Sequence, residues 1–251
     1  MTAAAGIFFS CKKQYTLAAV GSAPSGVAYL KIVHASPNFA KISGHADGLN
    51  IYLDTTKVNG PVLKFNSAYP AIGSVNTYAA VSPGSHTINI VVGGTVNADS
   101  IPIYSFQRTL VAGSYYTLLI TDSLQSAHDS AKVWAQDNIP SPTAGNIGLR
   151  FVNMVLDARA TDTMNLYSKR RSQILFPGVL RDSITPFSTF PTLTTLDSFY
   201  VKLANAPKDS TAASLFLTTT LVDQKVYTLY YIGDTTSVAA RKRTLIYVQN
   251  K

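Results

Sequence analysis

The stretch HTINIVV, residues 86–92, decides the fold class because its apolar residues alternate with the others. Ile88, Ile90 and Val92 fall on one face of an extended chain, and the intervening residues fall on the opposite face. An alternation with a period of two predicts a strand that buries one face. The sequence therefore predicts a β-sheet at this position.

Turn and strand signals surround this stretch. SPGS, residues 82–85, predicts a turn, and NTYAAV, residues 76–81, is predicted to pair back on residues 86–92 as a hairpin. YYTLLITD (115–122) and YTLYYIGD (227–234) are interpreted as further strands. The side chains expected to be largely buried are Ile88, Ile90, Leu118, Ile120, Leu229 and Tyr231.

The composition favours strands over helices. All 13 acidic residues of the 251-residue chain are aspartates, and 25 residues are Tyr or Phe (14 and 11). Glutamate favours helices, whereas aspartate favours turns and aromatic residues favour strands. No helix of normal length is expected, and no apolar stretch approaches the roughly 20 residues of a membrane-spanning helix. Several short strands with frequent turns predict an all-β protein built from β-sandwiches.

Four segments recur in the same order in the two halves of the chain. The matches are YLKIVHASPN (29–38) with GLRFVNMVLD (148–157), LNIYLD (49–54) with MNLYSK (164–169), YYTLLITD with VYTLYYIGD, and KVWAQDN (132–138) with LIYVQN (245–250). An ordered repeat predicts two domains of similar topology. We place them at residues 27–140 and 141–251, joined through the linker NIPSPTAGN.

The single cysteine, Cys11, rules out an internal disulfide and suggests a membrane anchor. Residues 1–11 resemble the end of a bacterial lipoprotein signal, in which a peptidase cleaves before a cysteine that is then acylated. The segment lacks a charged start and has a short apolar run. Either the true start lies upstream, or Cys11 is an ordinary cysteine. On the first interpretation Cys11 is the lipid attachment site and residues 12–26 are a flexible tether.

LKIVHASPN, LNIYLD and YAAVSPGSHTINIVV together resemble the bacterial family DUF4397, with a first copy close to its pattern and a second, divergent copy. In the second copy Asn153 stands where the first has His34. The resemblance implies two tandem immunoglobulin-like β-sandwich domains in a secreted or lipid-anchored protein, without an established enzymatic activity. It also implies an outer-membrane lipoprotein of the cell envelope, with the periplasmic face favoured over the outer surface.

Residues able to carry catalysis or bind metal are sparse. The four histidines do not have the spacing of metal-binding pairs, and His34 is interpreted as a half-buried residue that bonds to the backbone. No nucleophile, dinucleotide or phosphate-loop motif is present. Asp47 and Asp54 flank one predicted strand and are interpreted as strand-end residues. We therefore expect no enzymatic activity, no cofactor and no metal site.

The net charge of +8 is concentrated in the second half. Two basic clusters there are candidates for a patch that binds an anionic ligand: Lys169, Arg170 and Arg171, and Arg241, Lys242 and Arg243. Polysaccharide or lipid headgroups are the expected ligands, whereas nucleic acid is not expected in an exported protein. The favoured interpretation of both clusters is a solvated hairpin tip, and binding of an anionic ligand is the alternative.

Two functional hypotheses follow. The first is a non-catalytic, lipid-anchored envelope protein whose domains bind polysaccharide or another envelope protein, or act as a spacer. The alternative is a glycan hydrolase that uses aspartates, which requires two carboxylates about 5–10 Å apart in a cleft.

Overall fold

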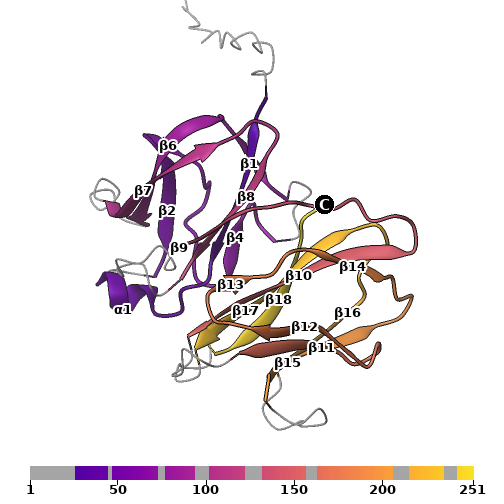
Figure 1. Ribbon diagram of the computed structural model, residues 1–251. Helices are drawn as coiled ribbons and strands as arrows, with labels where there is room; N and C mark the ends of the chain where they lie inside the picture. Colours follow the sequence, from indigo (N-terminus) through magenta and orange to yellow (C-terminus); the bar gives the residue numbers. More distant parts are fainter. Residues whose placement is uncertain are drawn as a thin grey trace, which may run out of the picture.

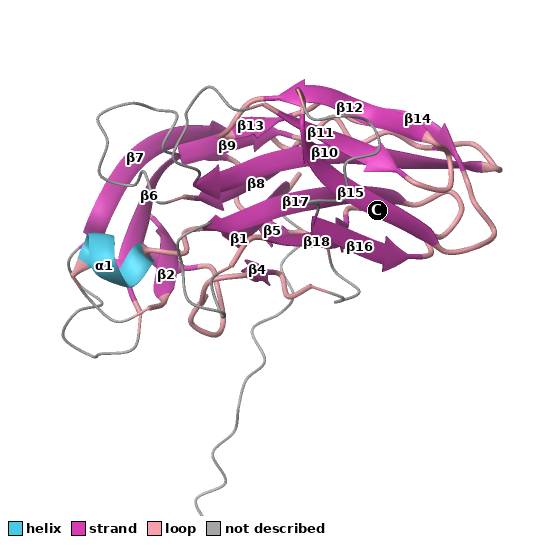
Figure 2. Cartoon of the chain, turned by 90° about the horizontal axis from the view of Figure 1, so that it is seen from below, coloured by secondary structure: helices cyan, strands magenta, loops and turns pink. Residues whose placement is uncertain are grey.

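The structure is a computed structural model that describes residues 26–44, 47–72, 77–93, 102–121, 132–156, 163–205, 215–234 and 242–251. It consists almost entirely of strands (Figures 1 and 2). Elements of the first half are β1 (Ala28–His34), α1 (Phe39–Ser43), β2 (Leu49–Leu53), β3 (Thr56–Lys57), β4 (Ser67–Tyr69), β5 (Ala79–Val81), β6 (Gly84–Val92), β7 (Pro102–Leu110), β8 (Tyr115–Ile120) and β9 (Lys132–Gln136). Elements of the second half are β10 (Asn146–Leu156), β11 (Met164–Ser168), β12 (Gln173–Val179), β13 (Ser183–Ile184), β14 (Ser188–Pro191), β15 (Asp197–Leu203), β16 (Leu215–Thr219), β17 (Val226–Asp234) and β18 (Thr244–Gln249).

The two halves have the same sheet topology. In the first half one sheet has the order β4-β1-β8-β9, with β5 also paired to β1, and the other has the order β3-β2-β6-β7. In the second half the orders are β13-β10-β17-β18, with β14 also paired to β10, and β12-β11-β15-β16. The strands therefore correspond one to one, and the prediction of an all-β fold made of sandwiches is confirmed.

Each half has its own core between its two sheets. Ile90 and Leu118 lie in the first core, and Leu229 lies in the second, all with 0% exposure. The other three residues predicted to be buried, Ile88, Ile120 and Tyr231, are at most 3% exposed. The period-two interpretation of these strands is confirmed.

A third apolar cluster lies between the halves, which pack side by side (Figure 1). Alternation along β8 explains how one strand serves two cores: Leu118 faces the first core, and Leu119 faces Val152 and Tyr230 of the second half. The inner sheets are thus covered on both faces, and all nine residues of β17 are buried. Strands buried on both faces have nearly continuous apolar sequences, as β17 does.

Matching tyrosines make the same hydrogen bond to the backbone in both sandwiches. The amide of Val111 donates to the hydroxyl of Tyr116 at 3.0 Å, and the amide of Val222 donates to Tyr227 at 3.0 Å. In each case a tyrosine at the start of a core strand bonds to the backbone a few residues upstream. A bond of this kind, in which a tyrosine hydroxyl reaches the backbone upstream, is called a tyrosine corner.

The predicted hairpin between residues 76–81 and 86–92 is wrong. β5 pairs with β1, whereas β6 pairs with β2 and β7 in the other sheet. Both edges of β6 already have partners, so β5 completes the edge of β1 instead. Gly84 has a φ of 128°, a conformation that favours glycine where the chain crosses between the sheets.

Several predictions fall on residues outside the described ranges, namely Cys11, the tether through residue 25 and Arg241. The segment between β1 and β2 forms α1, a five-residue helix that ends at Gly44 in the left-handed conformation. No helix in the described residues has the length and apolarity required to span a bilayer.

Candidate functional site

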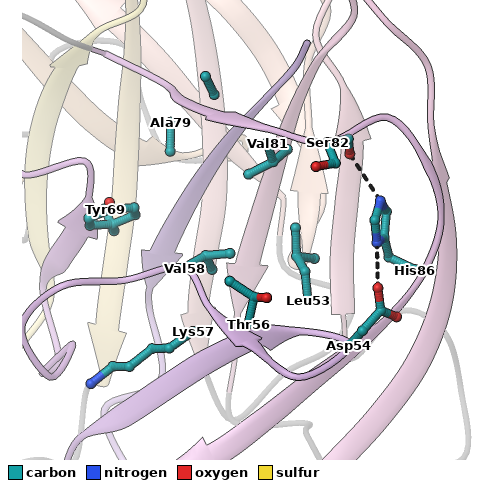
Figure 3. Close-up of a pocket in the computed structure, with 11 residues that line it drawn as sticks. Leu53, Asp54, Thr56, Lys57, Val58, Tyr69, Ala79, Val81, Ser82 and His86 are labelled. Carbon is teal, nitrogen blue, oxygen red and sulfur yellow. Dashed lines mark hydrogen bonds and ion pairs between the residues drawn. The ribbon is translucent and has the colours of Figure 1, made fainter. Parts of the chain in front are cut away.

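A groove opens at one edge of the first sandwich, between the β2–β3 hairpin and the edge formed by β4 and β5 (Figure 3). Its cavity has a volume of about 370 Å³, which is within the range of small-ligand sites. Leu53, Val58, Tyr69 and Val81 supply apolar surface. The remaining lining residues are Asp54, Thr56, Lys57, Ala79, Ala80, Ser82 and His86.

Asp54 and His86 close one end of the groove as a pair (Figure 3). His86 Nδ1 lies 2.7 Å from Asp54 Oδ2, and its Nε2 lies 3.0 Å from the carbonyl oxygen of Ser82. The two ring nitrogens thus face a carboxylate oxygen and a carbonyl oxygen. The bonds from His86 and from the Thr87 amide hold the pKa of the Asp54 carboxyl below its usual range. The pair therefore joins the end of β2 to the start of β6, and both ring nitrogens of His86 have hydrogen-bond partners.

His34, predicted to be half-buried, is fully buried at the end of β1. Its Nδ1 accepts a bond from the Ser36 amide at 3.3 Å, as predicted for a histidine that bonds to the backbone. Asn153, at the matching position of β10, accepts from the Val155 amide at 3.5 Å and donates to the Val179 carbonyl oxygen at 3.0 Å. Histidine and asparagine thus bond to the amide two residues onward in both halves.

The two aspartates considered for acid–base catalysis are far apart. Asp47 faces His34 Nε2 at 3.7 Å, whereas Asp54 binds His86. They lie at opposite ends of β2, whose five residues alone span about 17 Å. This separation exceeds the spacing of paired hydrolase carboxylates. Within the described ranges, no three His, Cys or Asp side chains come together as a potential metal site.

The first basic cluster lies at the tip of the β11–β12 hairpin. Lys169 and Arg170 are exposed, and with Leu196 and Ser198 they line a shallow cavity of about 320 Å³. Arg171 is bound inward: its guanidinium donates to Asp197 Oδ2 at 2.5 Å and to the Pro191 carbonyl oxygen at 2.6 Å. Arg171 therefore stabilises the fold, and its charge is neutralised by Asp197.

The second basic cluster lies at the other end of the same sandwich. Lys242 is exposed, and Arg243 Nη1 lies 3.4 Å from the Tyr231 hydroxyl. Arg243 precedes β18, which pairs with the end of β17 beside the end of β10. Arg171, by contrast, binds Pro191, which pairs with the first residue of β10. The described residues of the two clusters therefore do not form one patch.

A buried ion pair that the sequence interpretation missed joins the two halves. Asp137 follows β9 and Arg150 lies in β10, with exposures of 5% and 2%. Arg150 Nη1 donates to Asp137 Oδ1, and Asp137 Oδ2 accepts from Thr117 Oγ1 at 2.5 Å and from the Tyr78 hydroxyl at 2.7 Å. Arg150 Nε also donates to Thr228 Oγ1 at 2.8 Å. Both charges are thus paired and hydrogen-bonded, as buried charges require.

Lys31 occupies the position in the first half that Arg150 occupies in the second. It is fully buried; its ammonium donates to the Gln249 carbonyl oxygen at 3.1 Å and lies 4.5 Å from the centre of the Tyr78 ring. Burial and the charge of Arg150 lower the pKa of Lys31 to about 7, against the opposite effect of Asp137. Two basic side chains, Lys31 and Arg150, thus lie close to the buried carboxylate of Asp137.

Two sandwiches packed side by side, each with a tyrosine bonded to the backbone upstream and the first with an open, ligand-sized edge, define a tandem β-sandwich protein. The chain belongs to the DUF4397 family, a domain of unknown function, which matches residues 28–164. The match begins at the first strand of the first half and ends at the first residue of β11.

Two of the solved structures that match the chain have low similarity to it. The Bacillus anthracis TIE protein is 10% identical, with a TM-score of 0.20 over 83% of this chain and 34% of that protein. The chain thus spans about a third of its length. A putative cell adhesion protein from Bacteroides ovatus is 10% identical, with a TM-score of 0.21 over 90% of this chain and 95% of the other. Such TM-scores do not establish a common fold. No curated protein sequence matches the chain.

Proposed function

We propose that the protein is a non-catalytic, lipid-anchored binding protein of the cell envelope, and that the groove of the first half is its ligand site. The observation that carries the binding role is the open edge between β3 and β5, with its cavity of about 370 Å³. A cavity with an apolar floor and a few polar groups at its rim is typical of a ligand site.

The chemistry of the groove supports binding rather than hydrolysis. Asp54 is the one carboxylate among the residues that line it, and both of its oxygens accept bonds, from His86 and from the Thr87 amide. The two ring nitrogens of His86 are also engaged. Acid–base hydrolysis requires a second carboxylate at a defined distance, which this lining does not provide.

The anchor is proposed from the sequence around Cys11. One acyl chain binds a membrane only marginally, at roughly 0.8 kcal/mol per buried CH₂, so two or more chains on Cys11 supply a stable anchor. Mass spectrometry of the protein expressed with its complete leader is expected to show acyl groups on Cys11. The Cys11→Ala variant is expected to leave the membrane fraction, and a variant that remains membrane-bound would contradict the anchor.

The binding site is tested by filling the groove. Ala79→Trp places a large ring in the cavity, and Ser188→Trp makes the same change at the matching position of the second half. Binding of envelope polysaccharide and of solubilised envelope proteins from the native cells is measured for both variants and the wild type. Loss of binding in Ala79→Trp alone supports the groove, and equal binding by all three forms overturns it.

A further inference from the structure

Four consecutive residues, Ala79 to Ser82, line the groove. Because side chains of a strand alternate between its faces, a cavity against one face contacts every second residue. Contact with consecutive residues means that the cavity lies against the backbone edge of β5. β4 continues this edge, since β5 pairs with Ala28–Leu30 and β4 pairs with Ile32–His34 along the same side of β1.

The hydrogen-bond register shows which backbone groups of β5 face the groove. The Tyr29 amide donates to the Ser114 carbonyl oxygen at 2.9 Å, so Tyr29 directs its backbone groups toward β8. Leu30, one residue along β1, therefore directs its groups toward β5, where it pairs with Ala79. Ala80 lies opposite Tyr29 and consequently directs its N–H and C=O away from β1. Ala80 is exposed and lines the groove.

An outward-facing N–H and C=O of one strand residue are the pair of groups that bonds a further strand. The methyl side chains of Ala79 and Ala80 leave room for another backbone to approach. At one end the edge is closed, because the Ser82 carbonyl oxygen already accepts a bond from His86. The available edge is therefore short and specific, which limits open-ended strand addition.

Charge complementarity indicates the kind of segment that fits. Both oxygens of Asp54, the one carboxylate among the residues lining the groove, already take part in bonds to His86 and to the Thr87 amide, whereas the Lys57 side chain is exposed. A carboxylate of the partner near the Lys57 ammonium is favoured by this local charge.

From this geometry we infer that the groove binds an extended acidic peptide segment of a partner protein, which adds as a strand to β5. The inference rests on the proposed binding role of the groove. The segment's backbone bonds Ala80, an apolar side chain packs on Leu53 and Val58, and an aspartate or glutamate lies near Lys57.

The probes are acetylated octapeptides of alternating threonine and valine with one aspartate at each central position in turn. Matched controls have lysine in place of aspartate, or N-methyl groups on alternate residues. Binding to the full chain is measured by fluorescence anisotropy. At least one aspartate peptide is expected to bind, about tenfold more tightly than its N-methylated form, which loses backbone bonds.

Two proline variants test the edge itself. Ala80→Pro removes the outward N–H of β5, and Thr189→Pro removes the N–H at the matching position of β14. Proline is tolerated where an edge-strand N–H faces outward. Ala80→Pro is expected to weaken peptide binding about tenfold or more, and Thr189→Pro to leave it unchanged. Circular dichroism checks the fold of both, and the N-methylated peptides test the same bonds on the wild type.

Three outcomes overturn strand addition: no aspartate peptide binds, the N-methylated forms bind equally well, or a folded Ala80→Pro variant binds like the wild type. If polysaccharide binds the wild type and not Ala79→Trp while the peptides fail, the groove remains a binding site and the peptide inference alone is wrong.

Discussion

The two halves share a strand order but differ at one edge of the sandwich. β3 of the first half has two residues, and β12 of the second half has seven. The longer strand places Leu175, Phe176 and Val179 in the second core, where Phe176 packs edge to face on Phe190 with ring centres 5.8 Å apart. In the first half this side remains open as the groove. The length of one edge strand thus decides whether an edge becomes core or binding surface.

In the first half a side chain replaces the missing length of β3. Asn59, 1% exposed, accepts a bond from the Ile51 amide at 2.6 Å and donates to the Pro61 carbonyl oxygen at 2.8 Å. The side-chain amide of Asn59 therefore bonds to the backbone of β2. In the second half, β12 pairs with β11 at the corresponding position. The backbone groups of an edge strand can thus be hydrogen-bonded by a side chain without a further strand covering the edge. The groove therefore stays accessible.

The interface between the halves repeats the same positions with different chemistry. Lys31 lies over Tyr78 and Arg150 lies over Phe187, each 4.5 Å from the ring centre. Thr117 donates to Asp137 at 2.5 Å, and its counterpart Thr228 donates to Asn250, which replaces the aspartate, at 2.7 Å. The geometry at these matched positions is thus shared between the halves, whereas the Asp137 carboxylate belongs to the first half and its ion-pair partner Arg150 to the second.

The largest difference between matched positions is expected at Arg150 and Lys31. Arg150→Met leaves the buried Asp137 carboxylate without its ion-pair partner, which should cost about 3–5 kcal/mol of unfolding free energy. Lys31→Met leaves no unpaired charge and should cost much less. Urea denaturation of both variants measures the difference. Equal losses would show that the carboxylate is shared evenly by the two cations.

Matched core positions should respond alike. Leu118 and Leu229 both have 0% exposure, so replacing either with alanine should lower the unfolding free energy by about 2–5 kcal/mol. Because the halves share a buried interface, each variant is expected to unfold in one transition, which fluorescence and circular dichroism should follow coincidently. Two separate transitions, with only one displaced by each variant, would mean that the halves unfold independently.

Lys31 should make stability depend on pH. Its pKa is about 7 in the folded chain and 10.5 as the ordinary value, so between these pH values the unfolded chain binds a proton that the folded chain does not. The unfolding free energy should therefore rise with pH, by about 2–3 kcal/mol between pH 7 and pH 9. The contribution is lost as the pH falls toward 7. Denaturation of Lys31→Met over the same range should lack this rise, and an unchanged slope would exclude Lys31 as its source.

The smallest effects are expected at the tyrosine corners. Tyr116→Phe and Tyr227→Phe each remove one hydroxyl that accepts a backbone amide bond, and each should cost about 1 kcal/mol. Thermal denaturation of the two variants compares the corners directly. If only one of the two variants lost stability, the two matching hydrogen bonds would contribute unequally to the unfolding free energy.

The local sequence pattern was sufficient to predict some of the buried strands. The alternation of Ile88 and Ile90 and the apolar run around Leu229 predict buried strands because side-chain burial follows directly from periodicity. The order of the repeated segments also predicted the shared topology. The partner of β5 could not be predicted, since pairing depends on which distant edge remains open and not on the sequence of residues 79–81 alone.

The groove and the ion pair required the folded structure for a similar reason. Tyr69, Val58 and Ala79 come from three separate segments, which only the folded chain brings together. A signal for the interface was nevertheless present in the repeat, where Lys31 and Arg150 occupy the same position within apolar runs. A cation at a position that both copies bury requires a buried partner.

The position of β1 has a mechanical consequence. It is the strand by which the described fold begins, and it is bonded on one edge to β8 and on the other to β4 and β5. A force applied to the chain ahead of residue 26 is directed along the axis of β1, and therefore at right angles to the hydrogen bonds that β1 makes with its neighbours. Bonds on both edges are then loaded in shear and must rupture together, instead of opening one after another as in an unzipped hairpin. Tension on the N-terminal side is therefore shared by the whole first sheet.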